Sequence, residues 1–147
     1  MKKWLIVLSA SLLLLSGCSF ISDAKNLITY IDKSTDYLAV ATDFANEAPA
    51  LAQQAVENQQ AAQQFETMLQ EMQQEIDTFD GLQAPELAAD LHQQIVEKNN
   101  AISTGIDLFL NNIRNGKLDP AALENLEVFQ TALEISNIID QIKQLGE

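Results

Sequence analysis

Apolar residues recur at steps of three and four along the chain from Phe20 to Leu145, the spacing that places side chains on one face of an α-helix. The pattern divides into four segments, near residues 20–44, 51–79, 87–113 and 123–145. Each stripe is apolar on one side only, so the sequence predicts four helices that must pack against one another. The second stripe is the clearest, and only Asn58 interrupts it: Leu51, Ala55, Ala62, Phe65, Leu69, Met72, Ile76 and Phe79.

Groups of helix-breaking residues separate the segments. Residues 80–85 and 115–120 each begin with Asp or Asn followed by Gly, and each ends with Pro. Gly favours the position just past a helix end and Pro the first turn of the next helix, while Asp119 suits the N-cap position. The first corner, residues 46–49, has no Gly. The first two segments therefore form either a hairpin or one long helix kinked at Pro49.

Connections of about four to six residues favour antiparallel neighbours. We therefore predict an all-α fold, an antiparallel up-down four-helix bundle whose helices have about 20–30 residues each. An even number of helices returns the chain to its starting end. Glu147 should then lie near the corner at Asp80 and Gly81, and residues 48–49 and 116–120 should lie at the opposite end. The pattern contains no strand signal and no second domain.

The N-terminal residues differ from the rest of the chain. Lys2 and Lys3 precede twelve mostly apolar residues, 4–15, and small residues then lead to Cys18. This apolar stretch is shorter than the roughly 20 residues that span a bilayer, and it is typical of a cleaved export signal. Its ending, the sequence Leu-Ser-Gly-Cys at residues 15–18, resembles the lipobox of bacterial lipoproteins.

The lipobox resemblance implies that residues 1–17 are a signal peptide cleaved between Gly17 and Cys18, and that the Cys18 thiol carries a diacylglyceryl group. Cys18 is the only cysteine of the chain, and it falls at the position that a lipobox requires. The alternative is an ordinary signal peptide with an incidental cysteine. Two acyl chains anchor a protein stably, whereas one binds marginally. We expect residues 18–147 to form a lipid-anchored helical domain on the extracytoplasmic face of the cell membrane.

Charge narrows the choice of partners. The chain has 8 Lys and Arg against 21 Asp and Glu, a net charge of -13, which argues against a nucleic-acid binder. Signal cleavage removes Lys2 and Lys3 and no acidic residue, so the remaining domain has six basic residues and a net charge of -15. Anionic lipid headgroups repel such a domain. We expect it to stand off the membrane, with Ser19 as the only obvious spacer.

The residue types that catalysis or metal binding require are scarce. One Cys and one His cannot form an internal disulfide or a multi-histidine metal site. His92 has Ala89 three residues before it, where paired bundle metal sites have Glu, so we interpret it as a surface or edge histidine. We interpret Gly105 as a local weak point of its helix rather than a point of close approach. We predict no catalytic residue, no metal, no cofactor and no enzymatic activity.

Together with the lipobox, several stretches resemble an uncharacterised family of small membrane lipoproteins from bacillus-type Gram-positive bacteria. These stretches are residues 17–20, 46–49, 84–92 and 115–120. The resemblance implies a location on the outer face of the cell membrane and supplies no catalytic residue.

Two classes of function remain open. The first is an interaction or structural module of the cell envelope, with an envelope protein as partner, which fits an anchored bundle without a recognisable catalytic site. The second is a small-ligand or solute binder with a pocket between helices. In that case the polar residues that interrupt the stripes would face a cavity: Ser34, Thr35, Asn58, Asn99 and Asn100.

Overall fold

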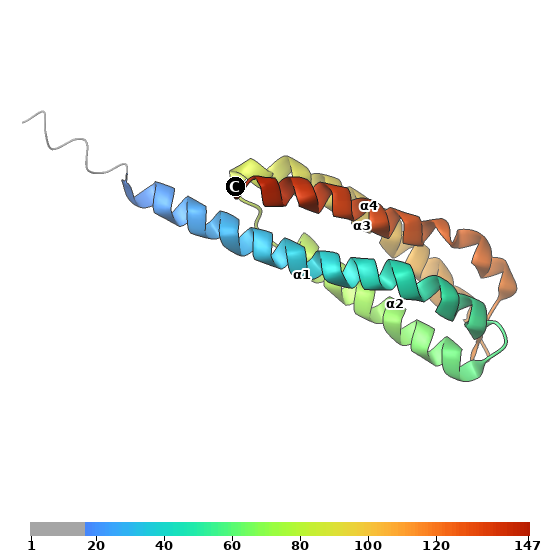
Figure 1. Cartoon of the computed structure of the whole chain (residues 1–147). Helices are drawn as coiled ribbons and strands as arrows, with labels where there is room; N and C mark the ends of the chain where they lie inside the picture. The colour runs from blue at the N-terminus through green and yellow to red at the C-terminus, as the bar shows by residue number, and fades with distance from the viewer. Residues whose placement is uncertain (1–16) are drawn as a thin grey trace, which may run out of the picture.

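Four helices joined by short connections dominate the computed structural model, which describes residues 17–147, with side chains from Ala24 onward (Figure 1). The helices are α1 (Gly17–Ala55), α2 (Gln59–Asp80), α3 (Ala89–Asn112) and α4 (Glu127–Gln144). Between them lie two short 3-10 helices, η1 (Glu86–Ala88) and η2 (Pro120–Asn125), and a hairpin of β1 (Ile113–Arg114) and β2 (Lys117–Leu118). The predicted all-α class is confirmed.

The helices pack in the order of an up-down bundle. α1 lies against α2 and α4, and α3 lies against the same two helices (Figure 1). One phenylalanine from each helix meets in the core, at ring-centroid distances of 5.2 Å for Phe65 and Phe109, 5.6 Å for Phe109 and Phe129, and 5.3 Å for Phe129 and Phe44. All four side chains are buried. The four apolar stripes of the sequence therefore converge on a single core.

α1 is one helix that runs through Pro49, so of the two alternatives at residues 46–49 the hairpin is wrong. The single long helix is wrong as well, because α2 starts as a separate helix at Gln59. The helix continues because its buried face continues. Small side chains are buried at steps of four and three on both sides of the proline: Ala41, Ala45, Ala48, Ala52 and Ala55. Pro49 is only half-buried, so it removes one helical hydrogen bond without interrupting this face.

The chain reverses nine residues later, at Asn58. This residue is the N-cap of α2, with extended backbone angles of φ -113° and ψ 114°. Its side-chain oxygen accepts hydrogen bonds from the backbone N–H groups of Gln60, at 2.8 Å, and Ala61, at 3.2 Å. The break that Asn58 makes in the apolar pattern is therefore the real corner between the first two helices.

The α3–α4 connection contains the hairpin, which contradicts the prediction that there is no strand. Asn115 and Gly116 form its turn with φ angles of 56° and 73°. Asn-Gly is the preferred pair for such a turn, because both positions need positive φ. The predicted cap after it is confirmed: Asp119 accepts a hydrogen bond from the Ala121 N–H at 2.9 Å, and Pro120 occupies the first turn.

The ends of the bundle follow the predicted grouping. A Cβ on Gly116 would lie 2.6 Å from the side-chain nitrogen of Gln59, so the hairpin turn lies beside the start of α2. At the other end, a Cβ on Gly146 would lie 2.7 Å from Ile31 of α1, and the α2–α3 connection lies nearby (Figure 1). The C-terminal residues thus lie beside the first half of α1, at the end of the bundle that holds the connection after Asp80 and Gly81, as expected.

α1 is much longer than its neighbours. It has 39 residues, against 22, 24 and 18 for α2, α3 and α4, and its N-terminal turns project beyond the bundle (Figure 1). None of the helices in residues 17–147 combines the length and the apolar character needed to cross a membrane.

Candidate functional site

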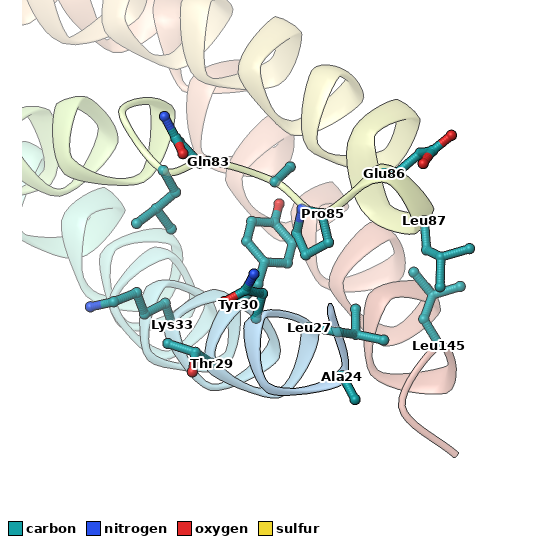
Figure 2. Close-up of a pocket in the computed structure, with 13 residues that line it drawn as sticks. Ala24, Leu27, Thr29, Tyr30, Lys33, Gln83, Pro85, Glu86, Leu87 and Leu145 are labelled. Carbon is teal, nitrogen blue, oxygen red and sulfur yellow. The ribbon is translucent and has the colours of Figure 1, made fainter. Parts of the chain in front are cut away.

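An open groove lies at the end of the bundle from which α1 projects. Its volume is about 780 Å³, within the range of ligand pockets in proteins. The walls come from the first half of α1, the α2–α3 connection and the last turn of the chain. Figure 2 shows Ala24, Leu27, Leu87 and Leu145 on one side of the groove, and Thr29 and Lys33 on the other.

The α2–α3 connection forms one wall because it is extended. α2 ends at Asp80 as predicted, and the Leu82 N–H then donates a hydrogen bond to the Phe79 carbonyl at 2.9 Å. Pro85 has φ -59° and ψ 155°, an extended conformation from which η1 starts. The backbone between these two points lies across the groove from α1, and Pro85 lines the groove (Figure 2).

The groove closes on Tyr30, whose side chain points toward the connection (Figure 2). Tyr30 is buried, and its hydroxyl oxygen lies 2.8 Å from Nδ1 of His92 on α3, within hydrogen-bonding distance. The His92 ring stacks on Phe79, with ring centroids 5.1 Å apart and 29° between the planes. The predicted edge histidine is therefore half-buried in an aromatic cluster.

Burial changes the proton affinity of both rings. It raises the pKa of Tyr30 to about 12. It lowers the pKa of His92, and the negative charge of Asp80 opposes that shift only in part. Both side chains are therefore favoured in their neutral forms, in which they can share one hydrogen bond without a buried charge.

A second polar cluster lies deeper and joins three helices. The Tyr37 hydroxyl of α1 donates to Oδ1 of Asn99 on α3, and Nδ2 of Asn99 donates to Oδ1 of Asp80 at the end of α2, at 2.6 Å. Tyr37 also stacks on Phe79, with ring centroids 4.5 Å apart. Burial raises the pKa of Tyr37, and it also raises the pKa of the Asp80 carboxyl, where the Asn99 hydrogen bond acts in the opposite direction. Among the side chains described, every buried N and O atom has a hydrogen-bond partner.

The polar residues that interrupt the apolar stripes do not line the groove. The hydroxyl groups of Ser34 and Thr35 donate to carbonyls one turn back in α1, at 2.8 Å each. Asn58 caps α2, and Asn99 belongs to the polar cluster, whereas Asn100 is exposed. The breaks in the apolar pattern therefore mark hydrogen bonds within α1, a buried polar cluster and a helix cap. None of them marks the groove.

Gly105 allows α3 and α4 to approach closely, which corrects its interpretation as a local weak point. A Cβ at this position would lie 2.6 Å from a methyl group of Val128 and 2.8 Å from its Cβ. No side chain larger than hydrogen fits there unless Val128 moves.

The predicted lipidation site lies at the first residues that the structure describes. Gly17 and Cys18 are the first residues of α1, their side chains lie outside the part described, and so do residues 1–16 of the predicted signal peptide. In the rest of the chain, no three His, Cys, Asp or Glu side chains are grouped as a metal site requires.

Comparison with known proteins adds a family and one curated relative. A model described as "Family of unknown function (DUF6376)" matches residues 30–145. The chain is similar to the "Uncharacterized lipoprotein YybP" of Bacillus subtilis (strain 168), with 31% identity over 148 residues, and the match covers 100% of both chains. No solved structure matches.

Proposed function

Because the chain belongs to the DUF6376 family of unknown function and resembles a lipoprotein along its whole length, we propose that it is a lipid-anchored module of the cell envelope. In this proposal the domain of residues 18–147 lies on the extracytoplasmic face of the membrane. It acts without catalysis, by binding or positioning an envelope protein.

One coincidence carries the proposal. The only cysteine of the chain ends a lipobox-like sequence, and the relative that matches from end to end is itself named a lipoprotein. A structural cysteine of the core is not expected at the end of an apolar segment of the kind that directs export. Cys18 with two acyl chains would instead give stable attachment.

The fold suits a tethered module. α1 begins at Gly17 and continues without interruption into the bundle, so Cys18 lies in the first turn of a helix that forms part of the core. Ser19, expected to act as a spacer, is itself part of this helix. An anchor at Cys18 would therefore hold the bundle through a rigid helix rather than through a flexible linker.

The polar groups of the interior support a non-enzymatic role. Tyr30 pairs with His92, and Tyr37 pairs with Asn99, which in turn holds Asp80. Each of these groups has a partner inside the bundle. They join α1 to α2 and α3. Buried polar networks of this kind fix a unique packing of the helices.

The first experiment is mass spectrometry of the N-terminal peptide from membrane-extracted protein. We expect a diacylglyceryl-modified Cys18 at the new N-terminus, and an unmodified chain for Cys18→Ala. Crosslinking in intact membranes should then enrich an envelope protein above the unanchored Cys18→Ala control. An unmodified Cys18 would contradict the anchor, and a crosslinking pattern equal to that of the control would contradict the interaction role.

The groove supports a second candidate, a small-ligand binder. The test is binding of an apolar fluorescent dye to the purified protein and to Ala84→Trp, in which a large side chain would occupy the groove. Dye binding that is lost in Ala84→Trp favours this candidate. Equal binding to both proteins would place the dye elsewhere.

A further inference from the structure

Charge is distributed unevenly over the bundle. The groove end comprises residues 23–33, 80–90 and 143–147, which contain three Lys and six acidic residues. The rest of the chain after Cys18 contains three basic and 15 acidic residues. The groove end therefore carries a net charge of -3, whereas the domain as a whole carries -15.

A nearby membrane interacts mainly with the closest charges. The Debye length is about 8 Å at physiological ionic strength. The opposite end of the bundle is roughly 30 Å away, the length of a helix of about 20 residues, so salt largely screens its acidic residues from the lipid. The lipid therefore meets mainly the net charge of -3 at the groove end, and the repulsion is correspondingly weaker than the net charge of the whole domain would give.

The same end exposes large apolar side chains. Leu87 on the groove is 71% exposed and Ile28 on α1 is 57% exposed. Leu145 contributes to the same wall of the groove (Figure 2). Such side chains are costly in water, and they gain free energy at the boundary between headgroups and acyl chains.

The tether would keep this end close to lipid. Ala24, the first groove residue, follows Cys18 by six residues, or about 9 Å along a helix. Given the anchor of the proposed function, on which this step rests, we infer that the groove end docks on the outer leaflet of the membrane. Leu87 and Leu145 enter the headgroup region, and the groove faces the lipid.

The test uses the native lipoprotein in vesicles of phosphatidylglycerol and phosphatidylethanolamine that contain a nitroxide-labelled lipid. A lipidated Cys18 has no free thiol, so Leu87→Cys introduces the only site for a fluorescent label. Leu108→Cys is the matched control, because Leu108 is also an exposed leucine, 43% exposed, near the other end of α3.

The expected result is quenching at residue 87 that is at least about twofold stronger than at residue 108. Docked side chains reach about 5–10 Å into the interface, whereas residue 108 lies roughly 30 Å farther along the bundle. Equal quenching at the two positions, in protein that still floats with the vesicles, overturns the docking and leaves the anchor intact. A wild-type protein that reacts with the thiol reagent and does not float contradicts the anchor itself. Self-quenching between labelled copies, without quenching by lipid, overturns the docking in favour of a contact between two copies.

Discussion

Replacing Asn99 by Leu tests whether the buried polar cluster holds the helices together. Asn99 is fully buried and makes two hydrogen bonds, one with the Tyr37 hydroxyl and one with the Asp80 carboxylate. Leu has a similar size but no polar atom, so Asn99→Leu leaves both partners without their hydrogen bonds. The Tyr37 side chain is buried, whereas the half-exposed Asp80 carboxyl can recover a water molecule.

The environments of the Tyr37 hydroxyl and the Asp80 carboxyl determine how much stability Asn99→Leu costs. An orphaned buried hydroxyl costs about 1–3 kcal/mol, and the lost bond to a partly solvated carboxylate adds about 1 kcal/mol. The apolar surface of Leu returns about 1 kcal/mol. We expect Asn99→Leu to lower the free energy of unfolding by about 1–3 kcal/mol, which is a large share of the roughly 5–15 kcal/mol typical of a domain.

The assay is urea denaturation followed by far-UV circular dichroism. The neighbouring Asn100→Leu is the control, because Asn100 is exposed and its replacement should change stability by less than about 0.5 kcal/mol. In the double variant with Tyr37→Phe the hydroxyl is gone, so about 1 kcal/mol or more of the Asn99→Leu cost should return. The reasoning is refuted if Asn99→Leu unfolds at the same urea concentration as Asn100→Leu, or if the two costs simply add.

Three further predictions test other contacts. Gly105→Ala should destabilise the protein by about 1–3 kcal/mol through overpacking against Val128, and adding Val128→Ala should recover part of the loss. A gain in thermal stability for Gly105→Ala alone would contradict the close approach of α3 and α4. Asn58→Ala should cost about 1 kcal/mol in urea denaturation because α2 loses its N-cap, and an unchanged midpoint would show that the cap is dispensable. Because burial lowers the pKa of His92, its contribution to stability is complete above the ordinary value of 6.5 and is lost as the pH falls through the folded-state pKa. His92→Gln, which retains a hydrogen-bonding group toward Tyr30, should remove this loss from a pH series of unfolding free energies, and an unchanged slope would contradict the assignment.

The helices were predictable because their signals are local. Each apolar stripe repeats every three or four residues, and Asp119 followed by Pro120 carries its own start signal. A hairpin at Pro49 was one of two alternatives, and it is wrong because a proline ends a helix only where packing does not compensate. Here partner helices bury the alanine face of α1 on both sides of the proline. Asn58 was visible as a break in the pattern, but its role as a cap depends on which helix pairs with α1.

The groove and the polar cluster could not be predicted because they depend on contacts between distant residues. Tyr30 and His92, like Tyr37 and Asn99, are 62 residues apart in sequence. The groove exists because residues 83–85 belong to no helix or strand and α1 continues past them, and neither property has a periodic signal. Asn99 and Asn100 are identical residues in sequence, and only the packing of α3 distinguishes the buried one from the exposed one.

The continuity of α1 has a consequence for how a partner would meet the domain. From Cys18 to Ala55 the helix is about 55 Å long, so a lipid anchor at Cys18 would be joined to the Asn58 corner by a single rigid element. A flexible linker would let the bundle sample many heights and orientations, but a helix limits them to rotation and tilt about the anchored end. If the groove end docks on the lipid, tilt is restricted as well, and the acidic remainder of the bundle is oriented away from the membrane. An envelope partner would then find this surface at a defined height above the membrane. The entropy needed to orient the domain would already have been lost on attachment, so binding the partner would cost less.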